Sequence, residues 1–181
     1  MPALMSAAPP QPGEAAALAA NDGVYLRQAI AWSCRARARG NPPFGAVVIG
    51  AQGELLSEAY CNTAETGDCT GHAETNAVRQ ISARVDRDTL AGATLYTSAE
   101  PCVMCAGAIF WSGIGRVVFG IDAARLHALQ VPRSRQAYAA AAAAAALSGR
   151  DVLAASPRFI ECIGPALVAE ASAPHVGFWS S

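Results

Sequence analysis

The alternation of apolar and polar positions divides the chain into helical and extended segments. Leu26, Ile30 and Cys34 recur four residues apart, which predicts an amphipathic helix that starts near Asn21 and ends at the Gly/Asn/Pro run 40–43. Further helices are expected over residues 72–85, 101–113 and 165–171. Short apolar, largely β-branched runs predict strands at 44–50, 54–62, 94–97, 116–121 and 159–164. Strands that alternate with helices predict an α/β fold with a sheet covered on both faces.

Three parts of the chain lack this periodicity. Residues 1–20 are rich in alanine and proline and are predicted to be a disordered tail, with a single domain over residues 21–181. Residues 131–158 are rich in alanine, which favours a helix intrinsically, so we expect a surface helix or a poorly specified insert that offers no chemistry. Residues 174–181 form a C-terminal tail with two neighbouring aromatic residues.

Composition narrows the function classes. The chain has 181 residues, of which 52% are hydrophobic and 15% charged, enough for one domain with a good core. Its basic residues are all arginine and its formal net charge is -1, so nothing favours an overall electrostatic grip on nucleic acid or on an anionic membrane. Residues 1–20 lack the basic and apolar regions of a signal peptide, and no apolar run approaches the roughly 18 residues that span a bilayer. We therefore expect a soluble, cytoplasmic protein.

The cysteines are expected to be reduced in that compartment, where paired cysteines bind metals or take part in catalysis more often than they form disulfides. Cys102 and Cys105 lie three residues apart, and therefore on one helical face, at the start of a predicted helix whose positive dipole end favours thiolates. His72 supplies a third ligand suited to zinc. Three protein ligands with an open fourth position are typical of a catalytic zinc site.

Glu74, two residues after His72, is a carboxylate placed to work beside this predicted site. Zinc lowers the pKa of a bound water toward neutrality, and a neighbouring carboxylate can then move protons. Residues i and i+2 point apart on a regular helix, so both side chains face one pocket only if His72 occupies an irregular first turn, which Gly71 permits. Cys69 lies three residues before His72 and is a competing ligand in principle, although a loop cysteine of no special role is the simpler interpretation.

The order H-x-E followed by P-C-x-x-C is the signature of zinc-dependent nucleobase deaminases. It is accompanied by FGAVV from Phe44, by Asn62, by the run LYTSAEPCVMCAGAIFWSGIGRVVFG and by Asp122. With these segments, residues 44–122 resemble the cytidine deaminase-like superfamily, in the branch that holds guanine, cytosine and tRNA adenosine deaminases. The resemblance implies a three-layer α/β/α sandwich with a five-stranded mixed sheet.

The resemblance also implies a cofactor and a reaction. One zinc ion per subunit would be bound by His72, Cys102 and Cys105. The reaction is the hydrolytic loss of an exocyclic amine from a ring amidine, with Glu74 as the catalytic residue that moves protons. By position in the motifs, the residues expected to contact the substrate are Phe44, Asn62, Ala73, Trp111 and Asp122. Simpler roles stay open for several of them: core packing for the two aromatic residues, a turn for the asparagine and a helix cap for the aspartate.

The C-terminal tail is expected to act as an aromatic lid. In the small-molecule branch of the superfamily, aromatic residues near the C-terminus close over the base, sometimes from the partner subunit. His175, Phe178 and Trp179 are the candidates here, because stacking and exclusion of water suit a free base. The alternative is that the two aromatic side chains anchor the chain end on the body of the protein.

The expected substrate is a small nucleobase. The tRNA adenosine deaminases usually carry a basic C-terminal helix, whereas this chain has no Lys or Arg after Arg158, so nucleic acid is not expected as a partner. Guanine is favoured because Phe44, Asn62 and Asp122 resemble guanine deaminases, although the alanine-rich insert replaces the segment where their substrate-specific residues lie. The alternatives are cytosine or another aminopyrimidine or triazine, tRNA adenosine, and a catalytically inactive zinc-containing binding module. A homodimer is expected because the superfamily commonly forms dimers.

Overall fold

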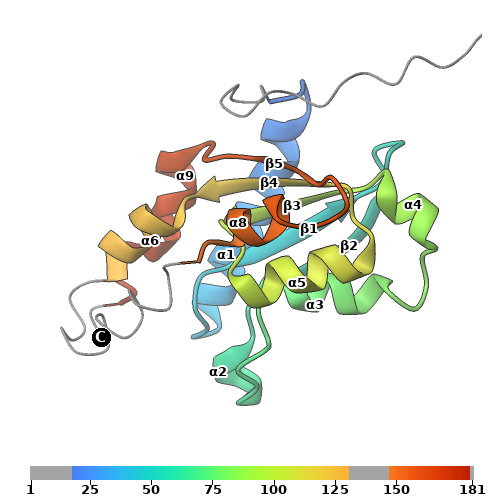
Figure 1. The fold of residues 1–181 in the computed structure, drawn as a ribbon. Coiled ribbons are helices and arrows are strands. Elements are labelled where there is room, and N and C mark those ends of the chain that lie inside the picture. Colours follow the sequence, from blue (N-terminus) through green and yellow to red (C-terminus); the bar gives the residue numbers. More distant parts are fainter. Residues whose placement is uncertain (1–17, 131–146, 180–181) are drawn as a thin grey trace, which may run out of the picture.

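Five short segments form one sheet in the computed structural model, which describes residues 18–130 and 147–179 (Figure 1). The strands are β1 (Gly45–Ile49), β2 (Leu55–Tyr60), β3 (Thr94–Ala99), β4 (Arg116–Ile121) and β5 (Glu161–Ile163). Their order in the sheet is β2-β1-β3-β4-β5. Strand β1 is antiparallel to both of its neighbours, whereas β3, β4 and β5 run parallel to one another. The predicted five-stranded mixed sheet is confirmed.

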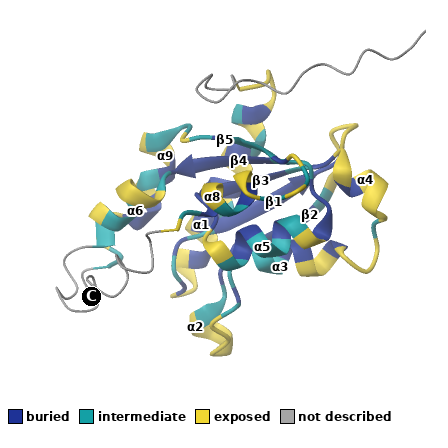
Figure 2. Cartoon of the chain, viewed as in Figure 1, coloured by how far each residue is buried: buried dark blue, intermediate teal, exposed yellow. Residues whose placement is uncertain are grey.

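Helices cover both faces of this sheet and complete the predicted three-layer sandwich. One face packs against α1 (Asp22–Ala38) and α9 (Val168–Ser172), and the other against α3 (Ala73–Ile81) and α5 (Val103–Ser112). Each face has its own apolar core, and β1, β3 and β4 are almost entirely buried between the layers (Figure 2). A further helix, α8 (Gly149–Ala154), packs against α5.

The start of β1 lies beside the end of β3, because the two strands are antiparallel. The backbone N–H of Gly45 donates a hydrogen bond to Ser98 Oγ (3.1 Å), which ties the two strand ends together. Gly45 also lets α1 approach closely, since a Cβ atom there would overlap the carbonyl oxygen of Ala29. Phe44, directly before β1, therefore lies beside the carboxyl end of β3, from which the chain continues to Cys102.

Two short helices that the apolar pattern did not predict are α2 (Thr63–Thr66) and α4 (Arg87–Ala91). Both lie in polar stretches that are too short to show an apolar period. Helix α4 depends instead on its cap, because the side chain of Asp86 accepts a hydrogen bond from the backbone N–H of Thr89. Local side-chain bonding of this kind is difficult to distinguish from a loop signal in the sequence.

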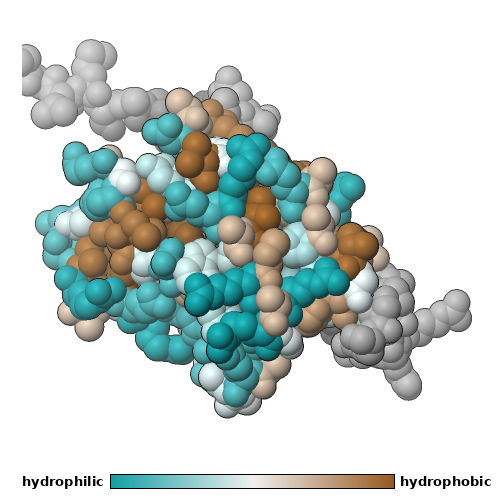
Figure 3. All heavy atoms as spheres, turned by 180° about the vertical axis from the view of Figure 1, so that it is seen from behind, coloured by the Kyte–Doolittle hydropathy of each residue, from teal (hydrophilic) through white to brown (hydrophobic). Residues whose placement is uncertain are grey.

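The other described segments are α6 (Ala123–Gln130) and a 3-10 turn, Ala173–His175, which follows α9. Most of the predicted disordered tail, most of the alanine-rich insert and the last residues of the aromatic tail fall on 1–17, 131–146 and 180–181, which lie outside the described residues. Within the described ranges, no helix is long and apolar enough to cross a membrane. Seen from the opposite side, hydrophilic side chains gather at the lower end of the molecule, beside α2 (Figure 3).

Candidate functional site

Two helix starts bring the predicted metal ligands together. His72 is the N-cap residue of α3 and Cys102 is the N-cap residue of α5, while Cys105 lies in the first turn of α5. His72 Nδ1 lies 3.5 Å from Cys102 Sγ and 3.6 Å from Cys105 Sγ. All three ligand atoms lie within 4.8 Å of one another, so this cluster can hold a metal ion.

These separations fit a tetrahedral zinc ion. Zinc binds cysteine sulfur at about 2.3 Å and histidine nitrogen at about 2.0–2.1 Å, which sets a nitrogen-to-sulfur separation of about 3.6 Å around a tetrahedral ion. The two observed separations, 3.5 and 3.6 Å, match this value. Cys105 is buried and Cys102 is exposed, so solvent reaches the cluster from the Cys102 side. The donor set and these two separations therefore suit zinc.

Electrostatics favour the thiolate form of Cys102. A hydrogen bond from the Cys105 thiol, together with the neighbouring His72, lowers the pKa of Cys102 to about 4. The hydrogen bond with Cys102 in turn raises the pKa of His72. The amino ends of α3 and α5 add partial positive charge from their aligned peptide dipoles. A thiolate is the form of cysteine that binds metal.

Glu74 faces the same cluster from the first turn of α3. The backbone of His72 is extended (φ -73°, ψ 151°) rather than helical, which is how His72 and Glu74 come to face the same two cysteines although they are two residues apart. The Glu74 side chain is buried, and its Oε2 lies 3.6 Å from Cys105 Sγ. Burial raises the pKa of Glu74 to about 7. A buried carboxylate beside a metal-binding cluster is suited to accept and return a proton.

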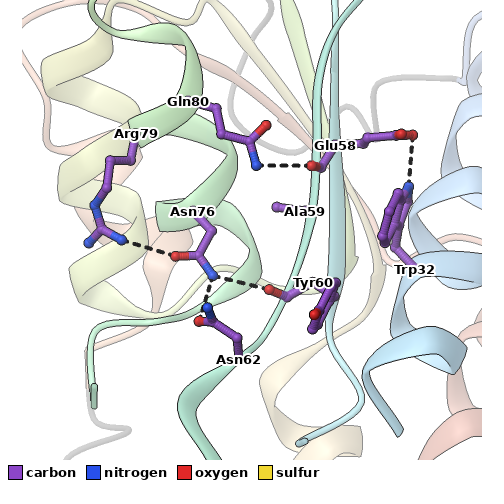
Figure 4. A pocket seen from close by; sticks show the side chains of 8 residues that line it. All are labelled: Trp32, Glu58, Ala59, Tyr60, Asn62, Asn76, Arg79 and Gln80. Carbon is purple, nitrogen blue, oxygen red and sulfur yellow. Dashed lines mark hydrogen bonds between the residues drawn. The ribbon is translucent and has the colours of Figure 1, made fainter. Parts of the chain in front are cut away.

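Asn62 is held in place by Asn76, a residue that the sequence motifs do not single out. Asn76 Nδ2 donates hydrogen bonds to Asn62 Oδ1 (2.9 Å) and to the carbonyl oxygen of Gly71 (3.2 Å). The backbone N–H of Asn62 donates to the same carbonyl (2.9 Å), which ties its loop to the residue before His72. Both residues line an outer pocket of about 460 Å³ at the edge strand β2. Figure 4 shows their two amides side by side. Sequence reasoning missed Asn76, and the signal that could have found it is its position four residues after His72 on the same predicted helix.

Phe44 and the end of the chain form an aromatic cluster, which we call the C-terminal cluster (Phe44, His175, Phe178 and Trp179). The ring of His175 lies edge-on to that of Phe44, with 5.1 Å between centroids, and is stacked on that of Trp179 at 6.0 Å. Phe178 packs edge-on against Trp179 at 4.9 Å. The structure therefore brings Phe44 together with the three residues of the predicted lid.

His175 is 1% exposed, yet neither of its ring nitrogens has a hydrogen-bond partner among the described residues, and the same holds for Trp179 Nε1. Burial lowers the pKa of His175 to about 4, so at neutral pH its ring is uncharged and offers one donor and one acceptor. Arg37 fixes the segment by donating to the carbonyl oxygens of Pro174 (2.7 Å) and Val176 (2.8 Å). Buried polar atoms are nearly always paired, so these atoms stand to gain from a polar ligand or water.

The structure does not bring Trp111 to the metal-binding cluster. Trp111 lies at the opposite end of α5 from Cys102 and is 74% exposed. Asp122 follows β4, and its carboxylate accepts a hydrogen bond from the backbone N–H of Arg125 (2.7 Å), as a helix cap does. Ala73 is fully buried in the core at the first position of α3. Among these three, only Ala73 adjoins a ligand residue in the chain.

Comparison with protein families gives a match to this region. The model of the cytidine and deoxycytidylate deaminase zinc-binding region matches residues 19–121. This range covers more than half of the 181 residues and contains the three ligand residues together with Glu74.

Known proteins resemble the chain over different lengths. A probable cytosine deaminase of Schizosaccharomyces pombe is 41% identical over 162 residues, which cover 90% of this chain and 94% of that protein. A tRNA-specific adenosine deaminase of Aquifex aeolicus is 36% identical over 95 residues, which cover 52% of this chain and 62% of that protein. A solved guanine deaminase from Nitrosomonas europaea superimposes with a TM-score of 0.66 at 24% identity, over 93% of this chain and 90% of that chain, which shows a shared fold.

Proposed function

The chain belongs to the zinc-binding cytidine and deoxycytidylate deaminase family, whose enzymes are hydrolases that act on C–N bonds, and on this basis we propose that it removes an exocyclic amine as ammonia from a free nucleobase. The observation that carries the proposal is the cluster of His72, Cys102 and Cys105 with Glu74 buried beside it. The first three residues would hold one zinc ion per subunit. A zinc ion bound there supplies a Lewis acid that makes water a nucleophile near neutral pH.

Glu74 is the proton carrier in this proposal. It accepts a proton from the attacking water as a new C–O bond forms at the ring carbon that bears the amine. It passes this proton to the neighbouring ring nitrogen. It then accepts the second proton from the new hydroxyl group and passes it to the amine, so that the C–N bond breaks and ammonia leaves. Burial of Glu74 supports the role, because it keeps bulk water away from the carboxylate while the protons move.

The C-terminal cluster would bind the ring of the substrate. Phe44 lies beside the carboxyl end of β3, from which the chain continues to Cys102. The Phe44 ring contacts the rings of His175 and Trp179. The aromatic faces suit stacking on a planar base, and the neutral imidazole can donate to one ring atom and accept from another. Asn62, held by Asn76, would supply a further polar contact from the loop before α3.

Guanine is the first substrate to test, and cytosine is the second. Phe44 and Asn62, which match guanine deaminases by their position in the motifs, support guanine. One relative that aligns over 94% of its own length is named a probable cytosine deaminase, and this is the specific reason to retain cytosine. A tRNA substrate is less well supported, because the formal net charge of -1 gives no overall attraction to phosphate groups.

The experiment is ammonia release by zinc-loaded protein from guanine, cytosine, isocytosine, adenine, an aminotriazine, the nucleosides and an adenosine-34 tRNA stem-loop. Glu74→Gln is the control, since it keeps the shape of the side chain but cannot carry the proton. Release from one free base that is lost in the control supports the proposal and identifies the substrate. Release from the stem-loop alone would overturn the substrate assignment, and zinc-bound protein that releases ammonia from none of them would favour a binding module.

We also infer that two copies associate through α5. Apart from Cys105 and its last serine, every residue of this helix is apolar or glycine, yet Val103 is 43% exposed and Trp111 74% exposed. A helix that is apolar on all sides is normally buried. A second copy of the chain would cover this surface and form the expected homodimer. Cytoplasmic localisation stays a prediction.

A further inference from the structure

Glu100, two residues before Cys102, is a buried carboxylate with three hydrogen-bond donors around it. Its side chain is 2% exposed. Its Oε2 accepts from the backbone N–H of Ala123 at the start of α6 (3.0 Å) and from Nη2 of Arg150 (3.2 Å), while its Oε1 accepts from Nε of Arg150 (3.1 Å). The backbone N–H of Glu100 donates to the carbonyl oxygen of Ile121 (2.8 Å). Both the side chain and the backbone of this residue are therefore fixed just before the first cysteine ligand.

Arg150 reaches Glu100 from α8, which lies in the segment where the sequence predicted no chemistry. A Cβ atom at Gly149 would overlap the carbonyl oxygen of Pro101, so the start of α8 rests directly on the residue that precedes Cys102. The start of α8 is itself fixed by a capping box, in which Ser148 and Asp151 bond each other's side chain and backbone. The backbone beside Arg150 is therefore fixed in two ways: by the Ser148 cap and by the contact of Gly149 with Pro101. We call residues Glu100–Cys102 the ligand loop.

The Arg150 guanidinium suits this position better than an ammonium group would. It binds the carboxylate through two nitrogens, one to each oxygen, and its Cζ lies 5.2 Å from the centroid of the Phe119 ring on β4. A planar fork can make both contacts at once, whereas lysine presents a single point charge. Without Arg150, the buried Glu100 carboxylate would keep, among the residues that the structure describes, only the hydrogen bond from the backbone N–H of Ala123. A buried charge with so little compensation moves toward water, and the loop that it belongs to moves with it.

From this geometry we propose that Arg150 is a positioning residue for the metal site. By holding Glu100, it fixes the segment Glu100–Cys102 so that the Cys102 sulfur lies at the spacing from His72 and Cys105 that one zinc ion requires. Cys102 has an extended backbone outside α5, so its sulfur is placed by this segment rather than by the helix. The inference rests on the proposed function only in that the cluster binds zinc.

The test measures zinc release from the full-length, zinc-loaded protein to a chromogenic chelator under native conditions. The variants are Arg150→Ala and Arg150→Lys. Arg27→Ala is a matched control, because Arg27 binds Glu170 through the same two-nitrogen geometry (2.8 and 3.0 Å), but on the exposed surface between α1 and α9. The second readout is the visible absorption spectrum of the cobalt(II)-substituted proteins, which reports ligand geometry and which a general loss of stability leaves unchanged.

We expect Arg150→Ala to release zinc about tenfold faster than the wild type or more, as variants of residues that orient metal ligands do. The cobalt spectrum of Arg150→Ala should differ from that of the wild type. The zinc release rate of Arg150→Lys should lie between those of the wild type and Arg150→Ala. Arg27→Ala should match the wild type in both readouts. Wild-type release rates and cobalt spectra in a folded Arg150→Ala protein would overturn the inference. If that variant does not fold, the same result in Arg150→Lys would overturn it. Failure of the wild type to retain zinc would instead count against the proposed function.

Discussion

The ring of Phe44, just before β1, meets the ring of His175 edge-on with 5.1 Å between the centroids. This contact places the 3-10 turn Ala173–His175 beside the carboxyl end of β3, from which the chain continues to Cys102. The imidazole is held by ring contacts and by the two carbonyl anchors of Arg37, and by no hydrogen bond of its own with a described residue. An unpaired buried donor or acceptor costs about 1–3 kcal/mol, so a role in binding would explain why a histidine occupies this position.

The variant His175→Phe tests that role by keeping the ring and removing its nitrogens. We expect KM for the substrate base to rise about tenfold, the equivalent of one lost hydrogen bond, with a smaller effect on kcat. The measurement is steady-state ammonia release by zinc-loaded protein, and Phe178→Leu serves as a control for general loosening of the cluster. An unchanged KM would show that the C-terminal cluster only anchors the chain end.

The same substitution has a pH-dependent effect on stability. Burial lowers the pKa of His175 to about 4 in the folded protein, whereas an unfolded histidine titrates near 6.5. Between these values the unfolded chain binds a proton that the folded chain does not, so the wild type loses stability as the pH falls from about 6.5 to 4. His175→Phe lacks this contribution and should gain relative to the wild type over that range. Urea unfolding at pH 7.5 and pH 4.5 measures the difference, and an equal gap at both pH values would contradict it.

Features carried by local patterns could be predicted from the sequence, and features set by distant packing could not. The strand and helix order, and the pairing of Cys102 with Cys105, follow from spacings within one segment. The orientation of Glu74 required the extended backbone of His72, which the sequence only permitted. No local sequence pattern identifies Arg150, because it meets Glu100 only after α8 has packed against residues Glu100–Cys102.

Trp111 and Asp122 show the limits of positional matching. The sequence assigns both to the substrate by their place in a motif, but a motif position does not say which way a helix face points. In the structure Trp111 lies on the exposed side of α5, and Asp122 bonds the first turn of α6. Asp122 is the simpler case, because an aspartate directly before a helix is a cap by default.

Asp22 is predicted to stabilise the fold at the opposite end of the sheet from the metal-binding loop. Arg116 donates to both of its carboxylate oxygens (2.7 Å each), and Tyr96 donates to one of them (2.8 Å). Asp22→Asn should lower the free energy of unfolding by about 2 kcal/mol at pH 7, because it weakens the charged hydrogen bonds to Arg116 and Tyr96, while Arg116 keeps its ion pair with Glu161 (2.6 Å). Chemical denaturation measures the loss, and Asp88→Asn on the exposed surface of α4 should have little effect.

The effect of Asp22→Asn should also depend on pH. Burial alone would raise the pKa of Asp22, but the hydrogen bonds from Arg116 and Tyr96 outweigh it, so the pKa lies below its ordinary value. The stabilisation is therefore fully present above the unfolded pKa, near 3.9, and is lost as the pH falls through the lower folded value. The difference in unfolding free energy between wild type and variant should shrink below about pH 3.9. A difference that stays constant to lower pH would exclude the carboxylate as its source.

The exposed face of α5 gives a prediction for assembly. Trp111→Glu should shift the protein from dimer to monomer, because it places a charge in the apolar surface that a second copy would cover. Sedimentation velocity at several protein concentrations measures the shift. Val24→Glu is the matched control, since Val24 is 54% exposed on α1. A dimer that survives Trp111→Glu would exclude this face as the interface.

The metal ligands are tested by comparing two exposed cysteines. Cys102 lies 3.5 Å from His72 Nδ1, whereas Cys69 lies in the loop before Gly71 and does not belong to the cluster that can hold a metal. Cys102→Ser should lose most of the bound zinc and all measurable ammonia release, because a serine hydroxyl stays protonated where the thiolate would bind. Cys69→Ser should keep one zinc ion per chain and wild-type activity. Zinc content after dialysis against a mild chelator distinguishes the two. If Cys102→Ser keeps one zinc ion per chain and Cys69→Ser loses it, Cys69 rather than Cys102 is the ligand, and the prediction is wrong.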